Sequence, residues 1–302
     1  MTKWGFQPID TYERVEYASQ TSCCVCDGGN RFDAEFCRHC RAPLALTLQT
    51  DPKKSPPQLV AVVGPPRVGK TVYLGMLTDI LSRQQGALQV LARGAFSVSL
   101  QQQSMSALAR RQFPPGTPVD PEGWNWVHFE VSNSPRRRPE QYVMPDISGE
   151  AFLQEVERGH GAPVIRAFLS KCSAALVLVD AEALEQGDQE PDFLAMKTVS
   201  YLVEMNRHRR KGWPARPVAI VFAKSDQSEL CFDDPEEYAR THTPGLWRQC
   251  KERLSRHRFF STSVIGACAP LHIRGEVTSM PLRIEPRGVE EPFIWIAKQL
   301  TK

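Results

Sequence analysis

One run of eight residues has the composition and spacing needed to hold a chain of phosphates, G-x-x-x-x-G-K-T. Its members are Gly64, Pro65, Pro66, Arg67, Val68, Gly69, Lys70 and Thr71. The glycines let the backbone curl so that amide N–H groups point inward at the phosphates, and a following helix adds the positive end of its dipole. Lys70 then bridges the terminal phosphates, and the Thr71 hydroxyl can bind magnesium.

Two prolines shape this loop. Pro65 and Pro66 carry no amide hydrogen. We therefore expect the nucleotide to rest mainly on the later residues, Arg67 through Val72, with Gly64 providing the entry turn.

The flanking segments supply the elements that such a loop requires. Residues 59–63 form a continuous apolar run of strand length, which predicts a central parallel strand. Residues 72–81 carry apolar side chains at helical spacing. Strand, loop and helix therefore follow in the order that phosphate binding needs.

A second group of candidate residues follows three later predicted strands. The segment 141–150 ends in D-x-x-G, in which Asp146 would hold magnesium through water and the Gly149 amide would sense a γ-phosphate. Residues 174–180 and 217–223 are buried strands, and the second leads into Lys224 and Asp226.

Lys224 and Asp226 indicate which nucleotide base is bound. Lys224 would lie along a purine, and Asp226 would accept hydrogen bonds from guanine N1 and N2, which adenine cannot reproduce. After a further strand, the backbone of Ser263 and Val264 is suitably placed to meet the guanine carbonyl. We expect GTP and GDP as ligands.

In this order the motifs resemble the translation-factor and Ras-like class of P-loop GTPases, over roughly residues 58 to 302. More narrowly, the strings at 113–118, 146–150 and 288–295 resemble the bacterial double-GTPase family. The resemblance implies a three-layer α/β domain with a mostly parallel sheet. It also makes Thr117 the switch I threonine that binds magnesium in the GTP state.

The same resemblance implies the biological setting. Domains of the double-GTPase family are associated with prokaryotic multi-protein conflict or regulatory systems. The expected partners are proteins that read the nucleotide state, and a second GTPase chain is one candidate.

Two positions depart from the pattern of related GTPases. Ala223 stands where the guanine motif usually begins with Asn, whose side chain ties the base-binding loop to the phosphate loop. An ATPase is therefore the first alternative. Glu150 follows D-x-x-G where related enzymes often have a glutamine that orients water, so it could act as a base or repel the γ-phosphate. We expect slow hydrolysis that a partner improves.

Four cysteines predict a separate module near the N-terminus. Cys23, Cys26, Cys37 and Cys40 form two C-x-x-C pairs, and four thiolates make a closed tetrahedral structural zinc site. Cys24 is read as a bystander. The predicted organisation is an N-terminal segment at 1–19, a zinc ribbon at 20–46, a linker at 47–57 and the GTPase domain at 58–302. The second alternative is a zinc-ribbon adaptor that binds nucleotide without turnover.

Composition narrows the remaining choices. The 302 residues have a net charge of +3, so no strong positive field favours nucleic acid, which is not an expected partner. No apolar run reaches the ~20 residues needed to cross a bilayer. An odd cysteine count with paired metal-type spacing indicates a reducing compartment, and we expect a cytoplasmic protein.

Three other segments have expected shapes. Residues 86–123 should form a switch region or lid, and Trp124–Val131 a half-exposed edge strand. The ribbon or a second chain could cover Trp124 and Trp126. Residues 267–288 are expected to be irregular because they are rich in proline, and a final amphipathic helix should begin at Glu290.

Overall fold

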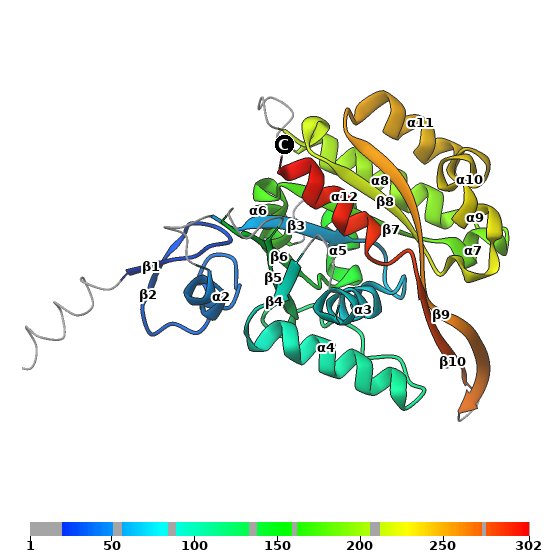
Figure 1. Ribbon diagram of the computed structural model, residues 1–302. Helices are drawn as coiled ribbons and strands as arrows, with labels where there is room; N and C mark the ends of the chain where they lie inside the picture. Colours follow the sequence, from blue (N-terminus) through cyan, green and yellow to red (C-terminus); the bar gives the residue numbers. More distant parts are fainter. Residues whose placement is uncertain are drawn as a thin grey trace, which may run out of the picture.

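The computed structural model describes residues 20–50, 56–83, 89–132, 138–158, 162–205, 212–273 and 276–301. A small N-terminal module lies at one end of a larger α/β domain (Figure 1). The small module contains β1 (Gln20–Ser22), β2 (Gly29–Arg31) and α2 (Leu44–Gln49).

The strands of the large domain are β3 (Gln58–Val63), β4 (Gln89–Ala92), β5 (Trp126–Ser132), β6 (Glu140–Pro145), β7 (Ala174–Asp180), β8 (Val218–Ala223), β9 (His257–Ile273) and β10 (Glu276–Arg287). The helices are α3 (Lys70–Arg83), α4 (Gly94–Ala109), α5 (Gly149–Arg158), α6 (Pro163–Lys171), α7 (Ala181–Glu185), α8 (Glu190–Glu204), α9 (Glu229–Asp233), α10 (Pro235–His242), α11 (Pro244–Arg253) and α12 (Glu291–Leu300). The described residues also form the 3-10 turns η1 (Pro121–Gly123), η2 (Trp213–Ala215) and η3 (Ser225–Gln227).

The large domain is built on one eight-stranded sheet in the order β10-β9-β8-β7-β3-β6-β5-β4. Pairing is parallel from β9 to β6 and antiparallel for β10, β5 and β4. Because parallel strands end at the same edge of a sheet, the segments after β3, β6, β7 and β8 meet there. The predicted site residues follow these strands.

Helices cover both faces of the sheet, which confirms the three-layer prediction (Figure 1). One buried cluster joins alternate residues of β3, such as Val60 and Val62, to α3, α4 and α12. The other joins Ala61 and Val63 to α5, α6, α8 and the small module. The central strands are apolar on both faces because each face is buried.

The region expected to be a lid is instead largely regular. Its described part contains β4, the sixteen-residue helix α4 and the short turn η1. Buried Ser97 and Ser104 occupy the packed face of α4 together with Leu100 and Leu108, so polar residues concealed the helical period. Gly75 of α3 faces the Ser104 side chain directly, which shows how closely the two helices pack.

Three other expectations need correction. β5 is not an edge strand, because β4 pairs with it and takes the edge. Residues 267–288 form much of the β9–β10 hairpin, since alternate ladder positions tolerate their prolines. The predicted linker at 47–57 begins inside α2, where Thr47 is buried. Thr50, which caps the end of α2, is also buried, and residues 51–55 lie outside the described residues.

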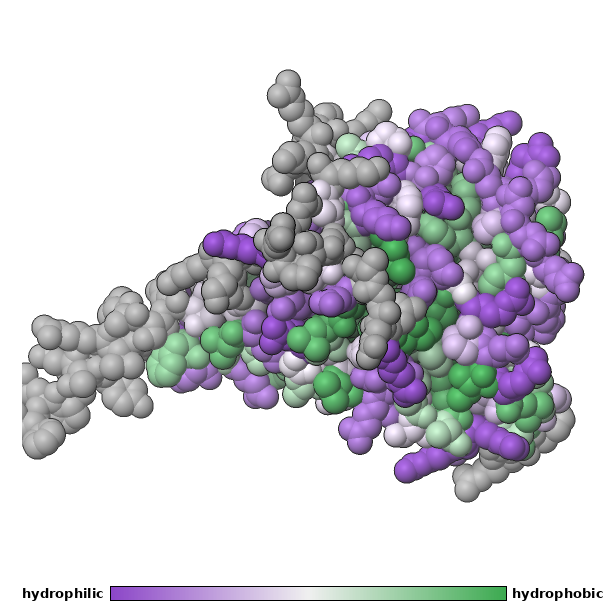
Figure 2. All heavy atoms as spheres, viewed as in Figure 1, coloured by the Kyte–Doolittle hydropathy of each residue, from purple (hydrophilic) through white to green (hydrophobic). Residues whose placement is uncertain are grey.

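The last helix agrees better with expectation. The predicted C-terminal helix is α12. On the face shown in Figure 2, hydrophobic residues appear in small groups separated by hydrophilic ones. No helix in the described parts of the chain combines the length and apolar character that crossing a membrane demands.

Candidate nucleotide-binding site and metal centre

The phosphate loop connects β3 to α3 and has the backbone shape of an anion-binding turn. Arg67 and Gly69 adopt positive φ angles of 63° and 100°, and α3 then begins at Lys70. The N-terminus of a fourteen-residue helix therefore faces the loop. The Arg67 side chain is exposed, whereas Val68 is buried and anchors the loop in the core.

Lys70 is folded into this loop. Its Nζ donates to the carbonyl oxygens of Gly64 and Pro65 at 2.9 and 2.8 Å, and the residue is 6% exposed. Burial lowers the pKa of Lys70 to about 8, against the opposing attraction of Asp146 and Glu150. A buried cation whose ammonium group is hydrogen-bonded to two carbonyls is prepared to receive an anion.

Three oxygen-bearing side chains meet beside Lys70. Asp146 Oδ2 accepts hydrogen bonds from Thr71 Oγ1 at 2.8 Å and from Thr117 Oγ1 at 2.7 Å, and the two hydroxyl oxygens lie 3.2 Å apart. The three residues come from α3, the segment before η1, and the end of β6. Contacts therefore join positions far apart in the sequence.

This trio suits a hard cation. Asp146 is fully buried, and its Oδ1 has no hydrogen-bond partner among the described residues. Burial raises the pKa of the Asp146 carboxyl, while the Thr117 and Thr71 hydrogen bonds and the charge on Lys70 oppose the rise. Magnesium prefers carboxylate and hydroxyl oxygens, so the donor set fits it.

The D-x-x-G segment lies directly on the phosphate loop. A Cβ added to Gly149 would lie 2.7 Å from the Pro65 carbonyl carbon and nearer still to Pro66 N, so only glycine fits there. Glu150 is exposed at the start of α5, and its Oε2 accepts a hydrogen bond from Ser148 Oγ at 3.0 Å. This carboxylate is thus oriented by its neighbour and open to solvent.

The loop after β8 is tied to its neighbours through Asp180, Ser225 and Thr262, which no motif identifies. Lys224, with a positive φ of 58°, places Nζ 2.6 Å from Asp180 Oδ2 at the end of β7. Ser225 Oγ donates to the Thr262 carbonyl at 3.0 Å. Because Ala223 cannot tie this loop, these two contacts hold it in place.

The candidate base-binding residues lie together. Asp226 is exposed, and its Oδ1 accepts a hydrogen bond from buried Ser263 Oγ at 3.1 Å. Val264 follows Ser263 in β9, which lies against η3. Val72 is half-buried in the first turn of α3.

The family model described as Double-GTPase 2 matches residues 58–272, which is most of the chain. The chain belongs to this family. No curated protein matches the sequence.

Solved structures of GTP-binding proteins are also similar to this Double-GTPase 2 member. Nucleolar GTP-binding protein 1 from Plasmodium falciparum is 14% identical with a TM-score of 0.40, covering 81% of this chain and 87% of that one. The Arl6 small GTPase from Trypanosoma brucei, with bound GppNp, is 13% identical with a TM-score of 0.41, covering 81% and 97%. The family assignment rests on the family model rather than on these matches.

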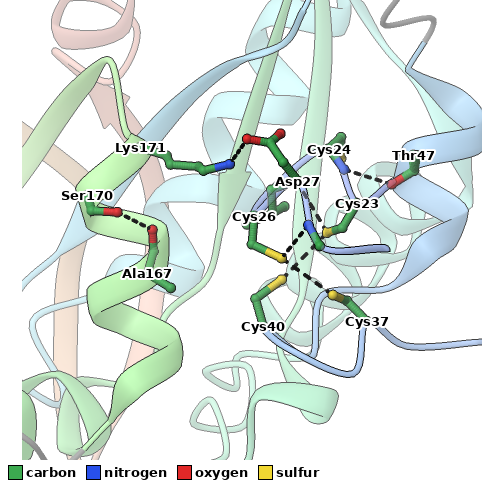
Figure 3. Close-up of polar contacts among 12 residues, drawn as sticks. Cys23, Cys24, Cys26, Asp27, Cys37, Cys40, Thr47, Ala167, Ser170 and Lys171 are labelled. Carbon is green, nitrogen blue, oxygen red and sulfur yellow. Dashed lines mark hydrogen bonds and ion pairs between the residues drawn. The ribbon is translucent and has the colours of Figure 1, made fainter. Parts of the chain in front are cut away.

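The N-terminal module of this Double-GTPase 2 protein gathers the four predicted cysteines. Cys23, Cys26, Cys37 and Cys40 have sulfur atoms within 4.8 Å of one another, and Figure 3 shows them converging. Zn–S bonds of about 2.3 Å in a tetrahedron imply S···S separations of about 3.8 Å. The observed pairs, Cys23–Cys40 at 3.6 Å and Cys26–Cys37 at 3.5 Å, are close to that value.

Backbone amides support this arrangement. The N–H groups of Val25, Gly28 and His39 each point at a cysteine sulfur at 3.4 Å, as suits thiolates held in two knuckles. Cys24 stands apart: its backbone donates to Thr47 Oγ1, and burial raises the pKa of its thiol to about 11. The residues fit a structural zinc ion, and Cys24 is not part of the set.

Proposed function

We propose that this protein binds GTP and GDP with magnesium, hydrolyses GTP slowly, and acts as a nucleotide-dependent switch. The observation that carries the proposal is the meeting of Thr71, Thr117 and Asp146 beside a buried Lys70. Membership of the Double-GTPase 2 family supports the same reading.

Each residue would have a defined task. The loop amides from Arg67 onward and Lys70 would bind the β- and γ-phosphates. Thr71, Thr117 and Asp146 would hold magnesium, which when bound neutralises charge on the β- and γ-oxygens. The Gly149 amide would contact the γ-phosphate, because that glycine already lies on the phosphate loop.

Slow turnover follows from the residue expected to orient water. Glu150 is an exposed acidic residue close to where the γ-phosphate would lie. It can accept a proton from water, yet it also repels the phosphate. A partner that supplies positive charge would favour the first effect over the second.

The proposed preference for guanine rests on Asp226, whose carboxylate is exposed and oriented by Ser263. Lys224 would cover the base with its aliphatic stem while Asp180 holds its ammonium group. Ala223 favours the alternative of an ATPase, because the usual asparagine tie is missing.

One experiment separates these functions. Unlabelled GTP and ATP compete against fluorescent GDP on the zinc-loaded protein, and phosphate release is followed separately. We expect GTP to compete at least tenfold better than ATP, and release to be slow. Equal competition would favour the ATPase, whereas binding without any release would favour the adaptor.

A pair of variants assigns Glu150. In the slow phosphate-release assay, Glu150→Ala should lose the residual rate if the carboxylate accepts the proton. Glu150→Gln should retain or raise it if repulsion dominates. An unchanged rate in both variants would remove Glu150 from the mechanism.

These activities would serve a partner. We propose that the ordered and released states of the Thr117 and Gly149 segments are read by another protein in a prokaryotic conflict or regulatory system. A second GTPase chain is the first candidate, and a cytoplasmic setting accords with the paired cysteines.

A further inference from the structure

The zinc ribbon packs against the part of the large domain that leads away from Thr117. Trp124 and Trp126 are 4% and 2% exposed and share one continuous buried cluster with the ribbon residues Cys23, Cys40 and Leu44. The ribbon and the two tryptophans thus belong to the same buried core, which favours the ribbon over a second chain as their cover. Its docking face is the face that carries the start of β5.

An ion pair also joins the ribbon to the segment just before Trp124. Arg41, which follows Cys40, pairs with Glu122 in η1. Arg41 also adopts a positive φ of 52°, at the turn of the second cysteine knuckle. The direction of the Arg41 side chain therefore depends on the fold of the second knuckle.

From Trp124 the contacts continue to Thr117. The indole Nε1 of Trp124 donates to the Pro118 carbonyl at 3.0 Å. A Cβ on Gly123 would lie 2.5 Å from Pro118 Cγ, so the turn folds tightly back on itself. Pro118 adjoins Thr117, whose hydroxyl reaches Asp146.

The turn is closed by further hydrogen bonds. The Asp120 carboxylate accepts from the Glu122 amide at 3.1 Å, and the Gly123 amide donates to the Asp120 carbonyl at 3.1 Å. On the other side of Trp124, the Asn125 carbonyl accepts from the Asp146 amide at 2.8 Å. Both ends of the segment therefore end at the candidate magnesium site.

We propose that Trp124, held by the ribbon, is a positioning residue for Thr117, and that the ribbon thereby sets how firmly magnesium and GTP are retained. This rests on the proposed function of the site. A segment already held by packing and by the Arg41–Glu122 pair loses less conformational freedom when Thr117 binds its ligand. Because less conformational entropy is lost on binding, the triphosphate is bound more tightly and dissociates more slowly.

The ribbon also has an anchor elsewhere. Asp27 pairs with Lys171 at the end of α6, as Figure 3 shows. This pair touches neither η1 nor the segment before it, so it provides a matched control. Trp213 provides another, because its Nε1 donates to the Leu169 carbonyl at 3.1 Å in a buried setting away from Thr117.

The test measures dissociation of a fluorescent GTP analogue and of fluorescent GDP from the full-length, zinc-loaded protein. Trp124→Phe keeps an aromatic, though smaller, ring and removes the hydrogen bond to Pro118. We expect analogue dissociation to become about three- to tenfold faster and the half-saturating magnesium concentration to rise, with GDP little changed. Trp213→Phe should leave both values within twofold of the wild type.

Charge reversal tests the ribbon itself. Arg41→Glu and Glu122→Arg should each speed analogue dissociation about two- to fivefold, and the double reversal should restore it. Asp27→Lys should not. Zinc content and thermal unfolding confirm that each variant is folded.

Hydrogen–deuterium exchange gives a readout that needs no nucleotide. Amides of residues 117–124 should exchange faster in Trp124→Phe and Arg41→Glu than in the wild type. Failure of the wild type to bind nucleotide would overturn the proposed function, and exchange would still decide the positioning. Unchanged exchange and dissociation in both variants, or an equal effect of Asp27→Lys, would overturn this inference.

Discussion

Charge is concentrated where the phosphate loop meets the end of β6. Lys70 and Asp146 are both buried there, and each is surrounded by groups that only partly replace water. Burial disfavours the charged form of both, in opposite pKa directions. A magnesium–nucleotide complex would satisfy both at once, because it supplies an anion to Lys70 and a cation to Asp146.

The lowered pKa of Lys70 predicts how nucleotide affinity depends on pH. The nucleotide-free site has a pKa of about 8, and phosphate binding stabilises the charged form, so binding takes up a proton above pH 8. Affinity should be nearly constant below pH 7.5 and about tenfold weaker at pH 9. Nucleotide titrations at a series of pH values between 7 and 9 measure this change in affinity.

A matched variant makes this test specific. Lys70→Arg keeps the charge at every pH in the range, so its residual affinity should lack this fall. The same slope in both proteins would assign the pH dependence to another group, such as the base itself.

Asp180 should matter for the base, because its carboxylate orients Lys224. Asp180→Asn should weaken guanine nucleotide binding by about three- to tenfold and reduce the preference over ATP. The measurement is competition against fluorescent GDP. Glu182→Gln is the control, since Glu182 lies farther from the same ammonium, at 3.6 Å. A larger loss in the control would contradict this role for Asp180.

At the scale of elements, the site depends on strands that end together and on segments that close over them. Gly149 is where α5 begins, and a Cβ at this position would collide with the phosphate loop at Pro65 and Pro66. Gly149→Ala should displace the start of α5 and weaken binding of a GTP analogue at least tenfold, with GDP changed much less. Paired titrations with the two nucleotides show this.

Gly116 is a suitable control for that substitution. A Cβ at Gly116 would meet nothing within 4 Å, although the residue adjoins Thr117. Gly116→Ala should therefore bind both nucleotides nearly as the wild type does. Equal losses of GDP and analogue in Gly149→Ala would mean that the glycine is needed only for folding.

The sequence predicts those strands and helices whose apolar residues follow a regular period. The apolar runs of β3, β7 and β8 and the helix α3 all form, and their order places Lys70, Asp146 and Lys224 at one sheet edge. The helix α4 was not predicted, because serines on its buried face interrupt the apolar period that indicates a helix. The long β9–β10 hairpin was not predicted, because its prolines suggested irregular structure.

Site residues divide in the same way. Motif spacing identifies Thr71 and Asp146, whereas Thr117 came only from resemblance to a family. Asp180 and Trp124 follow no motif, since their importance arises from contacts across the fold. An acidic residue ending a buried strand was the available signal for Asp180.

For the whole molecule, the ribbon and the large domain are parts of one packed structure. They share a buried cluster that includes Trp124 and Trp126, and two ion pairs flank it. A module this small would need a bound metal ion to fold. Loss of zinc from this site would therefore affect more than the module itself.

Zinc removal should expose the two tryptophans. Chelation is expected to lower the unfolding temperature and to shift tryptophan emission to longer wavelength. Elemental analysis should find one zinc per chain, retained in Cys24→Ser and lost in Cys37→Ser. Retention of zinc by Cys37→Ser would contradict the four-cysteine site, and an unchanged emission spectrum after chelation would contradict the packing.

The central claim is that a buried carboxylate and two hydroxyls hold magnesium for a guanine nucleotide. Calorimetric titration of the wild type and of Asp146→Asn with a non-hydrolysable GTP analogue, with and without magnesium, tests it most directly. Magnesium should tighten wild-type binding at least tenfold and leave Asp146→Asn almost unaffected. Binding that ignores magnesium in the wild type, or no binding of any guanine nucleotide, would contradict the account.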